Sequence, residues 1–548
     1  MFTHFSSQNL SRVKNVTKVG FILLVVLGLL LTFVPSTNAA KPPISAKSVE
    51  GMSISKIESG IKTHKFSCQQ LVSAYTDRIK AYDKQGPKLN AVINMNPKAE
   101  SQAAALDKKQ RSDKKLGPAH CVPVVVKDVI NTDDIPTTNG SKLFENWTPD
   151  KNATIINRLE AQGAIILAKT NLDDFAAAVY GISSLEGAIK NPYDLSRTVG
   201  GSSGGSAAAI AAQYAPLALG TDTGGSLRIP AALTGVVTIR PTVGLVSRQG
   251  IFPRALTQDT AGPLAADVKD AATGLDLIAG YDSNDPTTAR GVGKIPKQGY
   301  ASFAKGGRLK GTKIGLVTGG LAIWGDQPNG PVVQLLRKAA SDLEALGAEV
   351  IEIKGPDKDL LGGSSVITYE SAHDVNQFLS EQGPNVPVKS FQELYDSGNY
   401  SPYAKESYDR EIKIDPNTLS DNLNYQRALS MRTQLQDWTL DTMAKNNFSA
   451  IAYPSSAQLA DLIGKEQAGL FSRWSENTGF PAISVPMGYA ISNTGTSLPA
   501  NIEFLGRAFE EPEIIHIASA YENSTKNRVA PPLPGITTST NKVNHSKK

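Results

Sequence analysis

The sequence predicts an α/β protein in which a large mixed, mainly parallel sheet is covered by helices on both faces. Short runs rich in β-branched residues, among them VPVVVKDVI and AIILAKT, begin at Cys121 and indicate strands. Segments with apolar residues at helical spacing, such as TIINRLEAQG and VVQLLRKAASDLEALG, separate these runs. Alternation of strand and helix is typical of parallel pairing, and 40% apolar residues in a chain of 548 are enough to bury such a sheet.

Residues 1–40 predict a signal peptide. Three basic residues precede the apolar run VGFILLVVLGLLLTFV, and PSTNAA ends in the small residues of a cleavage site. Cleavage near Ala39 or Ala40 would give an exported protein, periplasmic or secreted. The alternative is an uncleaved membrane anchor, because the run is only slightly shorter than the ~17 to 25 residues that span a bilayer.

Residues 41–535 are expected to form a single catalytic domain. Residues 52–110 show helical spacing, as in CQQLVSAYTDRIKAYDKQ, and open the domain with a helical layer. After the strand runs PLALGTD, KIGLVT and AEVIEIK, residues 356–445 become polar and helical, which indicates a cap or insertion beside the sheet. AIAYPSS, GFPAISVPMGY and NIEFLGR return to strands, and residues 536–548 predict a disordered tail.

The charges, cysteines and histidines exclude several classes of protein. The net charge is only +5 and three basic residues lie in the first forty, so there is no basic footprint for nucleic acid. Cys68 and Cys121 are expected to be isolated buried thiols, and the alternative is a disulfide in an oxidising compartment if the fold brings them together. The six histidines have no HExxH spacing, so we expect no metal site and no cofactor.

The segment PLALGTDTGGSLRIPAALTG predicts a serine nucleophile. An apolar strand ends near Gly220, glycines form a tight turn, and a helix begins around Ser226. If Ser226 attacks a carbonyl, its own amide and those of Thr223, Gly224 and Gly225 can hold the oxyanion. A glycine turn that binds phosphate, or that binds no ligand, is also compatible with this sequence, so this segment alone leaves the function open.

A second glycine turn, GGSSGGSAAAIAA, matches the GxSxG pattern at both Ser202 and Ser203. In an α/β-hydrolase this pattern marks the nucleophile and requires a histidine further along the chain. His373 and His516 are the downstream histidines outside the tail, and both lie in helical segments where packing or surface roles are expected. An esterase with a histidine triad is therefore the less favoured interpretation.

Lys127 provides another way to activate a serine. It follows the apolar run VPVVV, where burial disfavours its charge and lowers its pKa. To act as a base near neutrality, the amine must lower its pKa from about 10.4 to about 7, which buried lysines can do. Taken alone, a lysine that reaches solvent or pairs with Asp128 explains the motif equally well.

Together, the lysine motif PAHCVPVVVKDVINTDDIPTTNGS, both glycine turns, PTVGLVSRQG and GFPAISVPMGY resemble the amidase signature family over roughly residues 50–535. The resemblance implies the family's fold. It also implies that Ser226 is the nucleophile, that Ser202 is a bridging serine reached through a cis peptide bond, and that Lys127 is the terminal base. The chain departs from the family at Cys121, where glycine is usual, and this could crowd the turn before the strand.

The resemblance also implies roles for three neighbouring residues. Asp222 and Arg228 would be buried supports of the nucleophile turn, and Ser203 would form hydrogen bonds within the site. The implied reaction is hydrolysis of an amide to a carboxylate and ammonia or an amine, through an acyl-enzyme on the serine.

The substrate is harder to derive from the sequence. YESAHDVNQFLSEQG and VKSFQELYDSGN resemble the branch of the family that includes bacterial peptide amidases, which implies C-terminal peptide amides as substrates. Fatty acid amides and small aryl amides are the alternatives within the family, and a non-catalytic binding protein is the alternative outside it. For an exported chain we expect no nucleic-acid partner and no obligate partner subunit.

Overall fold

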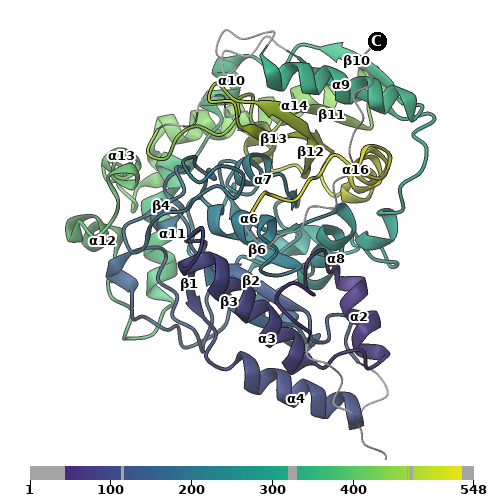
Figure 1. The fold of residues 1–548 in the computed structure, drawn as a ribbon. Coiled ribbons are helices and arrows are strands. Elements are labelled where there is room, and N and C mark those ends of the chain that lie inside the picture. The colour runs from purple at the N-terminus through teal and green to yellow at the C-terminus, as the bar shows by residue number, and fades with distance from the viewer. Residues whose placement is uncertain are drawn as a thin grey trace, which may run out of the picture. The chain divides into compact units, whose positions relative to one another are not determined.

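An eleven-stranded mixed sheet forms the centre of the protein in the computed structural model (Figure 1). The structure describes residues 44–112, 116–318, 330–465, 467, 469 and 473–533. The strands follow the order β1-β3-β2-β6-β8-β7-β12-β13-β11-β9-β10. Their bounds are β1 Val92–Met95, β2 Pro123–Lys127, β3 Ile165–Thr170, β6 Leu217–Asp222, β7 Val237–Arg240, β8 Thr260–Ala265, β9 Lys313–Val317, β10 Glu349–Ile353, β11 Ala450–Pro454, β12 Ala482–Ile491 and β13 Ser497–Leu505. A separate two-stranded ribbon consists of β4 Ile182–Ser183 and β5 Gly187–Ala188.

Helices follow most of these strands along the chain. They are α2 Ile54–Lys62, α3 Cys68–Ile79, α4 Ala99–Ser112, α5 Thr154–Ala161, α6 Gly204–Ala211, α7 Arg228–Thr234, α8 Val268–Ile278, α9 Pro331–Ala345, α10 Lys358–Gly363, α11 Ile367–Ser380, α12 Phe391–Ser397, α13 Pro402–Glu411, α14 Leu423–Asn446, α15 Arg473–Thr478 and α16 Glu511–Thr525. Helices α2 to α4 form the helical opening that the sequence predicts. Helices α10 to α14 lie between Lys358 and Asn446, close to residues 356–445, which the sequence predicts to be a helical insertion.

The prediction of a mixed α/β sheet is confirmed, but the prediction that it is mainly parallel is wrong. Strand β2 is parallel to β3 and β6, and β9 is parallel to β10 and β11. The remaining neighbours in the large sheet pair antiparallel. The reason is that helices do not separate all of the strands: β8 follows β7 without a helix between them, and a short turn joins β12 to β13. Strands joined in this way can pair antiparallel, whereas parallel neighbours need a long crossover.

Helices cover both faces of the sheet at β6. A Cβ added at Gly220 of β6 would meet side chains of Leu227 and Ser203, at the starts of α7 and α6. Leu217, three positions earlier and therefore on the other face, approaches Gly274 of α8. The strand is buried along its whole length as a result.

Small residues let α6 lie very close to the neighbouring backbone. A Cβ at Gly205 would be 2.4 Å from the carbonyl oxygen of Asn171, next to the end of β3. Every residue of α6 is buried. The glycine- and alanine-rich sequence of α6 therefore allows its backbone to pack closely on the backbone at the end of β3.

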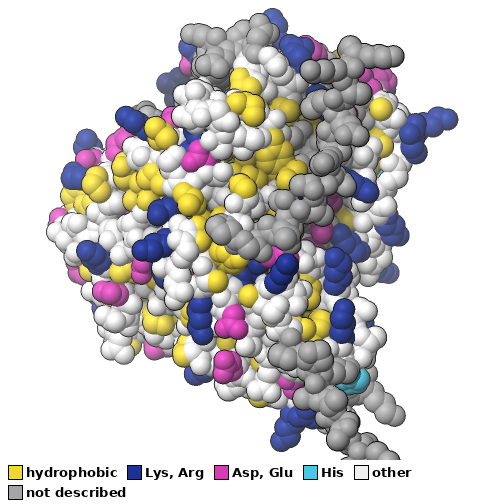
Figure 2. Space-filling view, viewed as in Figure 1, with side chains coloured by type: hydrophobic (Ala, Val, Ile, Leu, Met, Phe, Trp, Pro, Cys, Tyr) yellow, Lys and Arg dark blue, Asp and Glu magenta, His cyan; other side chains and the backbone are white. Residues whose placement is uncertain are grey.

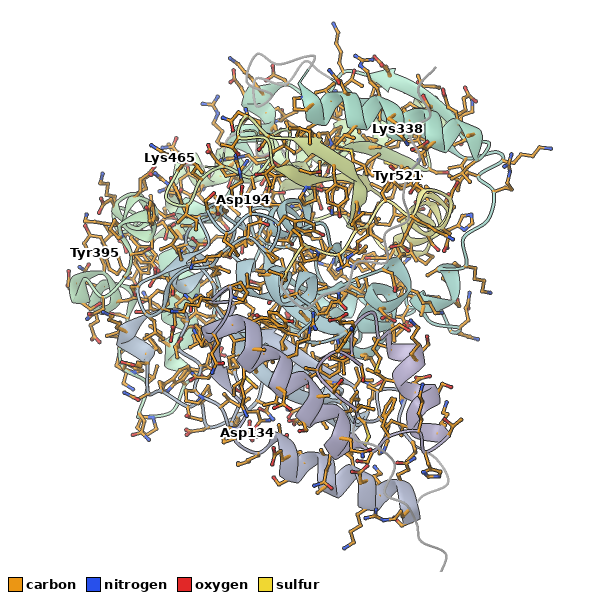
Figure 3. All side chains as sticks on the ribbon, viewed as in Figure 1. Asp134, Asp194, Lys338, Tyr395, Lys465 and Tyr521 are labelled. Carbon is orange, nitrogen blue, oxygen red and sulfur yellow. A yellow bond between two sulfur atoms is a disulfide. The ribbon has the colours of Figure 1, made fainter. Side chains whose placement is uncertain are left out.

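The described residues from Ile44 to Leu533 form one compact unit. At its C-terminal end, Tyr521 of α16, labelled in Figure 3, packs near Phe504 of β13, with ring centroids 6.3 Å apart. On the face seen in Figure 2, the described Lys and Arg side chains are interspersed with Asp and Glu. The predicted signal peptide and the predicted disordered tail lie outside the described residues. Among the helices that the structure describes, none combines the length and the apolar character needed to cross a membrane.

Candidate active site

Strand β2 delivers Lys127 into the interior of the protein. All five residues of the strand are buried, and Lys127 itself is 0% exposed. Its Nζ lies 2.7 Å from the hydroxyl oxygen of Ser202 and 2.7 Å from that of Thr221, on the neighbouring strand β6. The alternative pairing with Asp128 is wrong, because the Asp128 carboxylate faces the Nζ of Lys169 at 3.2 Å.

Burial changes the acidity of the Lys127 amine. Loss of water around the charged form lowers the pKa of Lys127 to about 7, although the negative charges of Asp173, Asp222 and Asp259 oppose this shift. Near neutral pH a substantial fraction of the amine is therefore uncharged and can accept a proton.

The first glycine turn brings Ser202 to Lys127 of β2 and Ser203 to Thr221 of β6. The peptide bond between Gly201 and Ser202 is cis, and both serines are fully buried. The Ser203 hydroxyl donates to the carbonyl of Thr221 at 3.0 Å and accepts from its N–H at 3.2 Å. The Ser203 N–H donates to the carbonyl of Ser226 at 3.1 Å. Ser203 thus ties together the two turns that carry Ser202 and Ser226.

The second turn, between β6 and α7, is organised by Asp222. Its carboxylate accepts the N–H groups of Gly225 at 2.9 Å and Leu227 at 3.1 Å. Ser226 lies between these two residues, is 5% exposed, and its hydroxyl has no hydrogen-bond partner in the described part of the chain. The turn therefore holds Ser226 firmly through its backbone while its side chain stays unengaged.

The amides of this turn differ in availability. Gly225 was expected to donate to an oxyanion, but its N–H is already used by Asp222, so this part of the prediction is corrected. The N–H groups of Thr223, Gly224 and Ser226 have no partner among the described residues. These three amides are the ones available to a substrate oxygen.

Arg228 stands at the centre of a buried ionic cluster beneath the turn. Its guanidinium contacts Asp222 at 3.0 Å, Glu476 at 2.7 Å and Glu503 at 2.7 Å. Arg240 adds a second contact to Asp222 at 3.3 Å. The predicted supports Asp222 and Arg228 do meet, and they belong to a larger network than the two residues alone.

The cluster separates the pKa values of its carboxylates. Burial would raise the pKa of Asp222, but Arg228 and Arg240 outweigh burial and hold it well below its usual range. Burial raises the pKa of Glu476 to about 7, although Arg228 opposes it. Asp222 therefore remains charged at any physiological pH and keeps its hydrogen bonds to the turn.

Sequence reasoning missed Thr221, Arg240, Glu476 and Glu503. Thr221 precedes the predicted turn and carries no motif of its own. For Glu503 a signal existed: it is a single acid within the apolar run NIEFLG, and an acid at such a position requires a buried cationic partner. No pattern in the sequence identifies which arginine is that partner.

A cavity of about 310 Å³ contains Ser226, Thr223 and Gly224. Helices α11, α13 and α15 and the segment 176–180 supply most of the rest of its wall. A larger cavity of about 430 Å³ lies around Arg248 and contains none of the predicted site residues. We therefore take the cavity at Ser226 as the candidate substrate site.

The two histidines of the esterase alternative do not line this cavity. His373 of α11 pairs through Nδ1 with Asp374 at 2.9 Å, and its side chain is 47% exposed. His516 lies on α16, no residue of which lines the cavity at Ser226. The structure does not bring either histidine to Ser202, Ser203 or Ser226 through any described contact.

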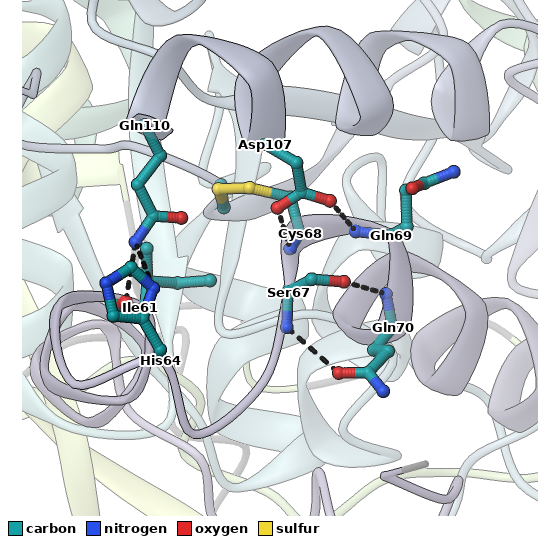
Figure 4. The surroundings of a disulfide bond; sticks show 9 residues. Ile61, His64, Ser67, Cys68, Gln69, Gln70, Asp107 and Gln110 are labelled. Carbon is teal, nitrogen blue, oxygen red and sulfur yellow. Dashed lines mark hydrogen bonds between the residues drawn. A yellow bond between two sulfur atoms is a disulfide. The ribbon is translucent and has the colours of Figure 1, made fainter. Parts of the chain in front are cut away.

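The prediction of two isolated thiols is wrong, because Cys68 and Cys121 form a disulfide (Figure 4). The start of α3 is fixed at Cys68: Ser67 and Gln70 form a capping box there, and Asp107 accepts the N–H of Cys68 at 2.8 Å. The helix therefore begins at Cys68, next to the turn before β2.

Cys121 itself has a φ of 66°, in the left-handed region that favours glycine. This conformation accounts for a glycine at this position and does not test whether the cysteine crowds the turn. His120 also lies beside the disulfide, with its ligand atom within 4.8 Å of both sulfurs. Because the sulfurs are bonded to each other, they are not free thiolate ligands for a metal ion.

Comparisons with known proteins show the family to which the chain belongs. The amidase family matches residues 70–515. A glutamyl-tRNA(Gln) amidotransferase subunit of Caldanaerobacter subterraneus subsp. tengcongensis is 32% identical over 499 residues, which cover 88% of this chain and 98% of that protein.

Among solved structures, native peptide amidase from Stenotrophomonas maltophilia aligns with a TM-score of 0.79 and 32% identity, over 88% of this chain and 99% of that one. The corresponding glutamyl-tRNA(Gln) amidotransferase subunit from Thermotoga maritima aligns with a TM-score of 0.68 and 28% identity, over 89% of this chain and 98% of that one. The chain therefore belongs to the amidase family and is an enzyme that acts on amides.

Proposed function

We propose that this enzyme hydrolyses a carboxylic amide to a carboxylate and ammonia or an amine, with Ser226 as nucleophile, Ser202 as bridging serine and Lys127 as base. One observation carries the proposal. The buried amine of Lys127, whose pKa falls to about 7, lies 2.7 Å from the Ser202 hydroxyl. The N–H of Ser203, the residue after Ser202, donates a hydrogen bond to the backbone carbonyl of Ser226.

In the proposed reaction, the Ser226 oxygen attacks the substrate carbonyl while its proton passes to Ser202 and the proton of Ser202 passes to Lys127. The carbonyl oxygen becomes an oxyanion, which the free amides of Thr223, Gly224 and Ser226 stabilise. The C–N bond then breaks, and the proton returns through the same two groups to the leaving nitrogen. Water attacks the acyl-enzyme by the reverse path, which releases the carboxylate and restores Ser226.

C-terminal peptide amides are the proposed substrates. Support comes from the higher TM-score to the peptide amidase, 0.79, than to the Thermotoga amidotransferase protein, 0.68. Many lining residues of the cavity are also polar or charged. A long fatty chain would desolvate these groups without pairing them, and we therefore place fatty acid amides and aryl amides second.

We further propose that the enzyme is exported and acts without an obligate partner subunit. The support is the basic and apolar pattern of residues 1–40. N-terminal sequencing of the protein recovered from culture fractions tests the first point, with a start at Lys41 or Ala40 expected. Turnover by the purified single chain tests the second, and activity that appears only after another protein is added would contradict it.

The central experiment measures ammonia released from a panel of peptide amides, fatty amides and small aryl amides. We expect release from peptide amides, and we expect Ser226→Ala to reduce it by at least about 1,000-fold because the acyl-enzyme cannot form. Release of ammonia from none of these amides would contradict the proposed substrate classes, and unchanged release in Ser226→Ala would contradict the assigned nucleophile.

Two histidine variants separate the proposed relay from an esterase. His373→Ala and His516→Ala should retain wild-type ammonia release, because neither side chain lines the cavity at Ser226. Loss of activity in either variant, with an unchanged circular dichroism spectrum, would favour the histidine triad.

A further inference from the structure

The cavity at Ser226 contains a buried cation that the proposed relay does not use. Arg254, in the segment between β7 and β8, lines this cavity and is only 3% exposed. Asp259 fixes its backbone: one carboxylate oxygen accepts the Arg254 N–H at 2.8 Å, and the other accepts the hydroxyl of Thr223. Arg254 is thereby held in a constant position relative to the nucleophile turn.

The guanidinium of Arg254 is charged, and its charge is already compensated. Burial alone would lower its pKa, but Glu411 of α13 outweighs burial and raises it. Nη2 donates to Glu411 and, at 3.3 Å, to the hydroxyl of Ser407. The guanidinium carbon also lies 5.6 Å from the centre of the Tyr408 ring. A second carboxylate at this position would add net negative charge to a pair that is already balanced.

One donor of this guanidinium is nevertheless unused. Nη1 of Arg254 is buried and has no hydrogen-bond partner among the described residues. Two acceptors from residues of the same cavity, Oε1 of Glu476 and Oδ1 of Asn477, are also buried and unpaired in the described part of the chain. Buried polar atoms are normally paired, so an unpaired donor and two unpaired acceptors around one cavity call for a ligand with complementary groups.

We propose that Arg254 binds a second carbonyl oxygen of the substrate, that of the peptide unit preceding the scissile amide, and so selects peptide amides and N-acyl amino acid amides over simple amides. This inference rests on the proposed function. A peptide unit supplies a neutral acceptor for the compensated guanidinium and an N–H donor for Glu476 or Asn477. A fatty or aryl amide has only the scissile carbonyl, which the turn amides engage, and leaves these groups unpaired.

The test compares two amides that differ only in the second carbonyl unit. N-acetyl-L-leucinamide has it, whereas 4-methylpentanamide has the same side chain and scissile amide without it. Arg254→Lys keeps the charge beside Glu411 but removes the forked donor. We expect this variant to lower kcat/KM for N-acetyl-L-leucinamide about 10- to 100-fold, as for loss of a hydrogen bond to a charged group, and to change it less than about 3-fold for 4-methylpentanamide.

Arg410 provides a matched control. It lines the same cavity, but its side chain is 54% exposed and its Nη1 lies 2.9 Å from Glu406. Arg410→Met should change kcat/KM for the two amides by the same factor. If Arg254→Lys does not fold, as judged by circular dichroism, the double variant Arg254→Met with Glu411→Gln removes both buried charges together and should show the same discrimination.

Equal losses for the two amides in the Arg254 variants, or no loss at all, would overturn the inference and leave the proposed function standing. A wild-type enzyme that releases no ammonia from either amide would contradict the proposed function itself, and the inference with it.

Discussion

Lys127 shows how a single side chain acquires a chemical property from its position. The strand PVVVK is buried on all sides, so the ammonium form of the lysine loses its hydration. Three aspartates, Asp173, Asp222 and Asp259, lie close enough to oppose this effect without cancelling it. The pKa therefore settles at about 7 instead of remaining in the ordinary lysine range. A small change in pH then alters the fraction of uncharged amine.

The pH dependence of turnover follows from this pKa. Protonated Lys127 cannot accept a proton, so we expect kcat/KM to rise with increasing pH through about 7 and to level off above it. Lys127→Ala should lower kcat/KM by about 100- to 10,000-fold and abolish the rise near pH 7. The measurement is kcat/KM for a peptide amide at several pH values between about 5 and 9. A rise of the same shape in Lys127→Ala would show that another group titrates.

The two glycine turns carry different parts of the site, and each depends on close approach of backbones and carboxylates. Asp173 accepts the N–H groups of Tyr180 at 2.9 Å and Gly181 at 3.0 Å, which holds its side chain against Gly201. Asp222 lies at the start of the other turn and accepts the N–H groups of Gly225 and Leu227. Asp222 satisfies N–H groups of its own turn, whereas Asp173 satisfies N–H groups of the segment 180–182 that lies beside the first turn.

Gly201→Ala tests this arrangement. A Cβ at Gly201 would lie 1.9 Å from the Asp173 carboxylate, so one of the two must move. We expect loss of most amide hydrolysis and a free energy of unfolding lower by about 1 to 3 kcal/mol. Gly362→Ala in α10 is the control, because nothing lies within 4 Å of the added carbon. Wild-type activity in Gly201→Ala would mean that the turn tolerates displacement.

At the level of elements, the sequence predicts what is local and misses what is distant. Short sequence segments predict the strand that ends at Lys127 and the glycine turns at Ser202 and Ser226. The meeting of Arg228 with Glu503 joins residues 275 positions apart, and no local pattern specifies it. The prediction of strand direction was wrong for a related reason. The spacing of apolar residues and the composition identify a strand, but its direction relative to a neighbour depends on the connection between the two strands.

For the whole molecule, the disulfide links the helical opening to the central sheet. Cys68 begins α3, and Cys121 lies just before β2, which ends at Lys127. The sequence left this pairing open, because two cysteines 53 positions apart pair only if the fold brings them together. Both residues are fully buried, so the link is part of the core.

Removing the link should destabilise the whole unit. For a loop of 53 residues, loss of the constraint on the unfolded chain corresponds to about 4 kcal/mol. We expect a Cys68→Ser, Cys121→Ser double variant to unfold at a lower urea concentration than the oxidised wild type. Its free energy of unfolding should be lower by about 4 kcal/mol. Reductant should shift the wild type toward the variant and leave the variant unchanged. A variant as stable as the oxidised wild type would show that packing alone holds α3 in place.

The bond between Cys68 and Cys121 also makes oxidation a step in the maturation of this enzyme. One polypeptide gives two covalent species that differ by two hydrogen atoms, and only the oxidised one fastens α3 to the segment leading into the Lys127 strand. Protein prepared in reducing cells and protein prepared in oxidising cells therefore differ in whether this disulfide is present. Alkylation followed by mass spectrometry should precede any comparison of their rates.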